Sequence, residues 1–174
     1  ENCIFRQNSA GQNGGGAFLR DYDGVIIDSE FLSNSANMGG GLSFRNLNWH
    51  TYPNISGTVV DNNTSGGIYQ RGANPVYTNV TISNNEGIGI LIADHLNVTL
   101  INSIVWGNES GQVAFEGSAN TCSVTISYSD IQGGESGINL PNDAEVVWVV
   151  GNIDSDPQFD ESGPGYTLTG LSPC

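Results

Sequence analysis

Apolar and polar positions along this chain repeat with a period of roughly 25 residues. Residues 31–45 read FLSNSANMGGGLSFR, and residues 5–20 read FRQNSAGQNGGGAFLR one period earlier. In both copies an apolar residue is followed three positions later by Asn, then by a glycine cluster and a short alternating run. Internal repeats of this length are typical of solenoids, in which each copy packs only on its neighbours.

The Asn of this signature recurs through most of the chain. It lies three residues after an apolar position at Asn8, Asn34, Asn63, Asn85 and Asn108. A further copy has Gly134 in its place. An Asn at a bend tolerates a left-handed backbone, and its amide can hydrogen-bond the Asn and the backbone of the next copy. We therefore predict a structural Asn column, with a polar binding stripe as the alternative.

The alternating run after each glycine cluster predicts a short β-strand. Its first inward position is Ala17, Leu42, Ile68, Ile90, Val113 and Ile138 in successive copies, and its second is Leu19, Phe44, Gln70, Ile92, Phe115 and Leu140. Another strand is expected before each Asn, as over residues 25–31 and 99–105.

Like residues therefore recur at like positions, as they do when the rungs of a coil stack about 4.8 Å apart. Hairpins would give no reason for a column with such a long period. We predict an all-β chain, a right-handed parallel β-helix of about six to seven rungs, each of 22–29 residues. The handedness follows from the rule for parallel crossovers.

We expect one domain over residues 1–174. Two of its segments depart from the regular repeat. Regular rungs are expected over 1–141, with a loop insertion at 46–54. The insertion carries Trp49 and Tyr52, which suit sugar stacking or a protein contact, unless Trp49 folds back over the coil. Residues 142–174 contain three prolines and are expected to form an irregular final rung and a covering segment.

The charge balance restricts the partners. The formal net charge is -14, because the chain has four Arg and no Lys against 18 acidic residues. Such a surface repels nucleic acid and anionic membranes, and no apolar run approaches the roughly 20 residues that span a bilayer. A divalent cation or a carbohydrate suits it better. This composition favours an extracellular or cell-surface location, and a start inside a repeat suggests a mature or excised piece of a longer precursor.

Cysteines and glycosylation sequons leave alternatives open. Cys3, Cys122 and Cys174 match no zinc spacing. They form one disulfide, Cys122–Cys174, or stay as buried thiols, or Cys174 of one copy joins Cys3 of the next. Sequons for N-glycosylation occur at Asn54, Asn62, Asn63, Asn79, Asn97 and Asn108, and matter only if the source glycosylates extracellular proteins.

Several motifs carry a family resemblance. They are NSIVWGN at 102–108, SYSDIQGG at 127–134, NIDSDPQF at 152–159 and YTLTGLSPC at 166–174. With the repeats described above, the chain resembles secreted bacterial right-handed parallel β-helix repeat proteins of the polymorphic outer-membrane-protein-like and pectate-lyase-like superfamily. The resemblance implies the fold and a secreted, surface-exposed protein. It implies little about activity, since this fold hosts both enzymes and inert scaffolds.

Two sets of residues are candidates for binding. Arg20, Arg45 and Arg71 fall in one column and could bind an anionic polysaccharide, or form a solvated face balanced by acids such as Asp21 and Glu116. Asp154, Asp156 and Asp160 offer hard oxygen ligands at the close spacing that suits Ca²⁺, but without the EF-hand pattern. The alternative for these aspartates is a turn capped by their side chains. No Ser or Cys arrangement with the two His marks a catalytic triad, so no catalytic residue is predicted.

Two functions remain. The first is a non-enzymatic extracellular structural or adhesive β-helix that joins end to end into a fibre or forms part of a longer surface solenoid, because the open ends of a coil can pair with another chain. The alternative is a carbohydrate-active enzyme, a polysaccharide lyase or hydrolase, or a carbohydrate-binding module. It would use the flank of Arg20, Arg45 and Arg71 with Trp49 and Tyr52 and would meet extracellular glycans.

Overall fold

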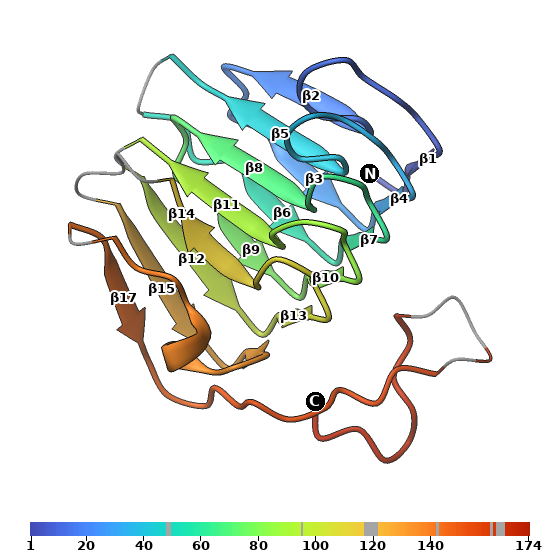
Figure 1. The fold of residues 1–174 in the computed structure, drawn as a ribbon, viewed down its shortest axis with the longest axis vertical. Coiled ribbons are helices and arrows are strands. Elements are labelled where there is room, and N and C mark those ends of the chain that lie inside the picture. Colours follow the sequence, from blue (N-terminus) through green and yellow to red (C-terminus); the bar gives the residue numbers. More distant parts are fainter. Residues whose placement is uncertain (48–49, 95, 117–121, 142, 161, 163–165) are drawn as a thin grey trace.

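The chain coils through three parallel sheets (Figure 1). A computed structural model describes residues 1–174 apart from 48–49, 95, 117–121, 142, 161 and 163–165. Within the described residues the regular structure is seventeen strands and one short 3-10 helix, η1 (Glu135–Gly137). Each turn visits the first, second and third sheets in that order, and the first turn lies at the top of Figure 1.

The strands of each sheet come from successive turns. The first sheet contains β1 (Ile4–Arg6), β4 (Glu30–Leu32), β7 (Val59–Asp61), β10 (Thr81–Ser83), β13 (Ile104–Trp106) and β16 (Asp130–Ile131). The second contains β2 (Ala17–Arg20), β5 (Leu42–Arg45), β8 (Ile68–Arg71), β11 (Ile90–Ala93) and β14 (Val113–Phe115). The third contains β3 (Val25–Ile27), β6 (Asn54–Ser56), β9 (Val76–Thr78), β12 (Asn97–Ile101), β15 (Ser123–Ser127) and β17 (Glu145–Trp148).

The predicted β-helix is confirmed, with fewer turns than expected. Sheets of six, five and six strands make about five complete turns rather than six to seven. The sixth turn supplies β16 and β17 but no strand to the second sheet, where Asn139 makes only an isolated bridge to Ala114. The sequence count was too high because it gave this incomplete turn the weight of a full one.

The predicted inward columns are in register over the first five turns; in the sixth copy Ile138 is buried, but the predicted inward Leu140 is 43% exposed. Ala17, Leu42, Ile68, Ile90 and Val113 are successive partners in the second sheet, as are Leu19, Phe44, Gln70, Ile92 and Phe115. From Leu42 to Val113 the first column is at most 1% exposed. Stacking of like residues therefore builds a continuous apolar core along the coil axis.

The strand expected before each Asn is in fact two strands joined at a corner. Over residues 25–31, β3 ends at Ile27 and β4 begins at Glu30, with Asp28 in the left-handed region (φ 47°). Asn102 (φ 49°) makes the equivalent corner between β12 and β13. Asp and Asn tolerate this conformation better than most residues, so the chain turns here from the third sheet to the first. The coil consequently has three sides.

The C-terminal residues continue the coil and then leave it. After β17, Ile153 bridges Asp130 at the edge of the first sheet. Phe159 and Leu168 then form an antiparallel bridge, and this segment runs below the coil in Figure 1. Among the described residues there is no helix of the length and apolarity that a membrane crossing requires.

Candidate functional site

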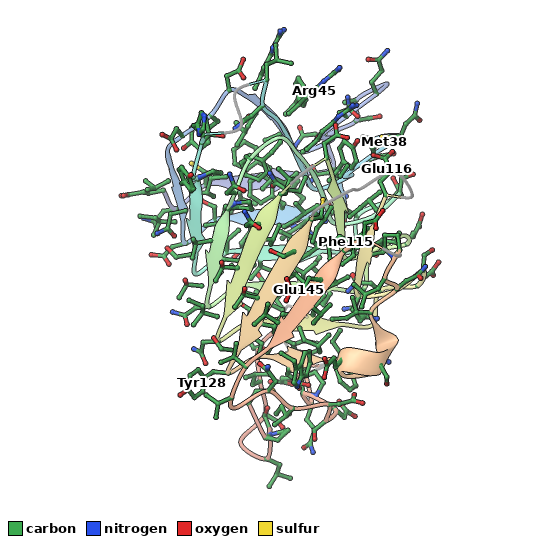
Figure 2. All side chains as sticks on the ribbon, turned by 90° about the vertical axis from the view of Figure 1, so that its left-hand side faces the viewer. Met38, Arg45, Phe115, Glu116, Tyr128 and Glu145 are labelled. Carbon is green, nitrogen blue, oxygen red and sulfur yellow. The ribbon has the colours of Figure 1, made fainter. Side chains whose placement is uncertain are left out.

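The three column arginines lie side by side on the outer face of the second sheet. Arg20, Arg45 and Arg71 end strands β2, β5 and β8 and are register partners. Because inward and outward residues alternate, the inward Leu19, Phe44 and Gln70 leave the arginines pointing outward. Figure 2 shows Arg45 projecting near the N-terminal end of the coil.

The arginines differ in their acidic partners. Nε of Arg20 lies 3.7 Å from Oδ2 of Asp21, and Arg71 forms a close ion pair with Asp94. The hydrogen bond that Arg71 donates to Asp94 raises the pKa of Arg71. Among the described residues, Arg45 has no ion-pair partner. A cavity of about 140 Å³ lies beside it, lined by Arg45, Asn46, Leu47, Arg71 and Asp94. A cationic, solvent-reachable position therefore occurs between two neutralised ones.

A second outward column, which the sequence analysis missed, runs beside the arginines. Phe18, Ser43 and Tyr69 are register partners. Phe18 is 43% exposed, whereas Tyr69 and Ser43 are buried. The Ser43 hydroxyl has no hydrogen-bond partner in the part of the chain that the structure describes. The available signal was the alternation itself, since these residues fall between the inward positions. The exposed ring of Phe18, on the same face as Arg20, can stack against a planar or sugar-like ligand.

The insertion at 46–54 lies beside the same flank. Its first residue, Asn46, is buried: its Oδ1 accepts from the Tyr22 N–H (3.3 Å) and its Nδ2 donates to the Tyr22 carbonyl (3.2 Å). Tyr52 is 62% exposed, and its N–H donates to Oδ1 of Asp23 (2.5 Å). Trp49 lies outside the described residues. These hydrogen bonds fasten the insertion to residues 22–23 of the preceding turn.

The Asn column forms a hydrogen-bonded ladder along the corner after the first sheet. In its centre, Oδ1 of Asn63 accepts from the N–H (2.8 Å) and Nδ2 (3.1 Å) of Asn34. Nδ2 of Asn63 donates in turn to Oδ1 of Asn85 (2.9 Å) and to the carbonyl of Phe31 (3.0 Å). Asn8 and Asn108 extend the same pattern. Because these amides are satisfied within the coil, the ladder offers no binding stripe.

The sequence analysis expected the Asn to be the left-handed residue at this corner, and this was wrong. It is the residue before it: Gln7, Ser33, Asn62 and Asn84 have φ between 52 and 56°, and Gly107 has φ 69°. The Asn itself keeps its amide directed along the axis, into the ladder. The left-handed backbone conformation and the ladder hydrogen bonds therefore fall on two adjacent residues.

A second ladder, of hydroxyl groups, follows the corner between the third and first sheets. Ser29, Ser103 and Ser129 each donate from Oγ to the carbonyl two residues earlier, at 2.9 Å. Thr58 does the same at 3.0 Å. The sequence analysis read two of these residues as ordinary strand positions. They can be recognised in the sequence because a small hydroxyl residue directly precedes four of the first-sheet strands.

The three aspartates proposed for calcium each accept a hydrogen bond from a different residue. Asp154 Oδ1 accepts from the Gly133 N–H (3.0 Å), Asp156 Oδ1 from the Gln158 N–H (2.9 Å), and Asp160 Oδ1 from Ser162. The Ser162 hydrogen bonds lower the pKa of Asp160. Over the described ranges, no three His, Cys, Asp or Glu side chains form a group able to hold a metal ion. Asp156 and Asp160 match the capped turns given as the alternative, whereas Asp154 accepts from a backbone N–H 21 residues earlier in the chain.

The cysteines lie apart. Sγ of the buried Cys122 accepts from the Leu96 N–H (3.4 Å), whereas the Cys174 thiol donates to Oδ2 of Asp130 (3.0 Å). The expected Cys122–Cys174 disulfide is therefore not formed in this structure. Burial and the neighbouring Asp130 raise the pKa of Cys174 to about 11, which keeps it a thiol. Cys3 is exposed on the first turn.

The sequons divide by exposure. Asn54, Asn62, Asn79 and Asn97 are exposed. Asn63 and Asn108 belong to the buried ladder, so a glycan on either would require its hydrogen bonds to break. Only the first four are therefore accessible in the folded chain.

The comparison with known proteins agrees with this architecture. The family model described as the right-handed beta helix region matches residues 1–154, most of the chain. No curated protein and no solved structure matches significantly. The match covers the three sheets and both ladders described above. The chain therefore belongs to the right-handed β-helix family.

Proposed function

We propose that this protein is a non-enzymatic, extracellular structural or adhesive β-helix whose coils join end to end. The observation that carries the proposal is the stacking of parallel strands in three sheets, in which each turn pairs through its backbone with the next. The backbone groups on the outer side of an edge strand pair readily with another strand.

The internal chemistry supports the same function. Buried amide and hydroxyl side chains at two corners of the coil join successive turns, through the Asn and hydroxyl ladders. The acidic, lysine-free composition supports a location outside the cell, where such a coil would meet surface glycans or further copies of itself.

Static light scattering across a concentration series tests association. We expect the mean mass to rise with protein concentration. A constant monomer mass up to the highest soluble concentration would contradict the proposal. Incubation with polygalacturonate, alginate and algal polysaccharides, with and without Ca²⁺, tests the absence of catalysis. New unsaturated or reducing ends would assign an enzyme instead.

Glycan binding on the arginine flank is a second candidate. It is favoured by the in-register column and by Arg45, which has no ion-pair partner among the described residues. Guanidinium groups one strand spacing apart suit carboxylates along an extended anionic polysaccharide.

Titration calorimetry with polygalacturonate oligomers tests this candidate. We expect Arg45→Ala to weaken binding about tenfold, since a hydrogen bond to a charged group contributes roughly 1.5–3 kcal/mol. Arg6→Ala is the matched control, because Arg6 is an exposed arginine at the end of a first-sheet strand and lies outside the column. Equal binding by wild type and Arg45→Ala would contradict glycan binding by the arginine flank.

A further inference from the structure

The outer face of the third sheet is uncharged, unlike the outer faces of the other two sheets. Among the described strands, β3, β6, β9, β12 and β15 contain no Asp, Glu, Lys or Arg, and the charged Glu145 enters this sheet only on β17. Outward positions of the first and second sheets carry Arg6, Glu30, Asp61, Arg20, Arg45 and Arg71. A chain with a formal charge of -14 therefore presents one extended neutral face.

Two columns of outward side chains make up this face, and the members of each column are register partners in successive turns. They are Val25, Asn54, Val76, Thr99 and Thr125 in the first column, and Ile27, Ser56, Thr78, Ile101 and Ser127 in the second. All ten are at least partly exposed. Their five hydroxyl groups form no hydrogen bond to another residue that the structure describes, whereas the hydroxyl ladder at the neighbouring corner is satisfied within the coil. These five hydroxyls are therefore available to a ligand outside the coil.

Strand pairing gives these side chains a regular spacing. Neighbouring strands lie about 4.8 Å apart, and alternate residues along one strand lie about 6.6 Å apart. Seven of the ten side chains are β-branched, which restricts their χ1 rotamers and fixes their methyl and hydroxyl groups. Figure 2 shows the strands of this sheet side by side, with Glu145 on the last of them. The face is thus a two-dimensional array of methyl and hydroxyl groups.

From these observations we infer that the outer face of the third sheet binds ice. The strand spacing is close to the distance between equivalent water molecules in the basal plane of hexagonal ice, so successive turns can meet successive lattice positions. The hydroxyls can donate to and accept from lattice water, and the methyl groups leave liquid water when they lie against the crystal. The inference does not depend on the association proposed above, because this face lies along the side of the coil.

Two other partners fit this face less well. A charged polymer would find no charge-assisted hydrogen bond in either column. Aromatic rings are the side chains that suit sugar stacking, and neither column contains one, since the Tyr77 ring of β9 points inward and is fully buried. An ice surface requires neither charge nor aromatic stacking.

Slow growth of ice into a dilute solution of the chain tests the inference, because a growing crystal excludes solutes that it does not bind. We expect the wild type to be enriched in the ice. Thr78→Lys adds a charge that the ice lattice cannot hydrate, so this variant should be excluded like a non-binding reference protein. Thr81→Lys is the matched control and should be enriched like wild type, because Thr81 is a partly exposed outward threonine of the first sheet, only three residues further along the chain.

The possible outcomes separate this face from other surfaces and other ligands. Far-UV circular dichroism establishes that each variant keeps its strands. Exclusion of the wild type from ice would overturn the inference, and so would an equal loss of enrichment in both variants. Binding of the wild type to insoluble cellulose or chitin without enrichment in ice, lost in Thr78→Lys alone, would assign the face to a neutral glycan instead. End-to-end association is tested separately by the light-scattering series.

Discussion

Single amides hold successive turns of this coil together. Each central ladder Asn uses two donors and one doubly accepting oxygen, so all of its amide hydrogen-bonding groups are engaged in the core. Neither Asp nor a hydroxyl residue supplies the same set of two donors and an acceptor. Asn34, Asn63 and Asn85 are fully buried, where an unsatisfied amide is costly.

Replacing a ladder Asn therefore has a large effect on stability. We expect Asn63→Ala to lower the free energy of unfolding by about 3 kcal/mol, because the donors of Asn34 and the carbonyl of Phe31 lose their buried partner. Asn54→Ala, on the exposed face of β6, should change it by less than about 0.5 kcal/mol. Urea unfolding measures both. Equal effects would mean that the ladder contributes nothing specific.

The carboxyl group of Asp61 is partly desolvated in the fold. Burial raises the pKa of Asp61 above its ordinary value of 3.8, although Ser83 and Asn84 donate to its Oδ1. The protonated form is thus favoured in the fold, and the stability it contributes is lost as the pH rises through the folded-state pKa.

Asp61→Asn removes this titration and keeps the Oδ1 acceptor. We expect the variant to melt roughly 1–3 °C above wild type at pH 7, and the difference to disappear near pH 3, where the wild-type carboxyl is protonated. Thermal melts at the two pH values measure this. A difference that grows on acidification would contradict the assigned direction of the pKa shift.

At the scale of elements, the repeating turn could be predicted from the sequence wherever side chains stack. The inward columns and the alignment of Arg20 with Arg45 and Arg71 follow from the period alone. The left-handed corners could not be found in this way, because Gln7, Ser33 and Gly107 share no residue type. Gln112, whose Oε1 accepts from Nδ2 of Asn108 at the end of the Asn ladder, was missed because its role depends on a side chain that the next turn lacks.

Each turn is a separable unit, since its contacts are with the turns before and after it. Deleting residues 60–81 removes one 22-residue period and joins Val59 to Ile82, which occupies the same position as Val60. We expect a folded coil whose urea m-value is lower by roughly one eighth, the share of the chain that is removed. Deleting only residues 60–70 removes half a turn and displaces every later column, so this control should not fold. Circular dichroism with urea titration measures both. Loss of structure in both deletions would contradict the repeat register.

At the scale of the whole molecule, the coil has a direction. All four of its Arg lie within residues 1–71, and most of its negative charge lies beyond residue 71. Figure 2 shows Arg45 towards one end and Tyr128 and Glu145 towards the other. The sequence analysis expected two open ends and therefore a fibre as one outcome. The covering of the last turn by Trp148 and the capping by Gln112 depend on packing, which no periodicity reveals.

Small-angle X-ray scattering over a concentration series tests the central claim most directly, because it separates the length of a particle from its cross-section. The account predicts a maximum dimension that increases with concentration, with an unchanged radius of gyration of the cross-section. A maximum dimension that does not change with concentration, or a cross-section that grows with it, would contradict end-to-end association.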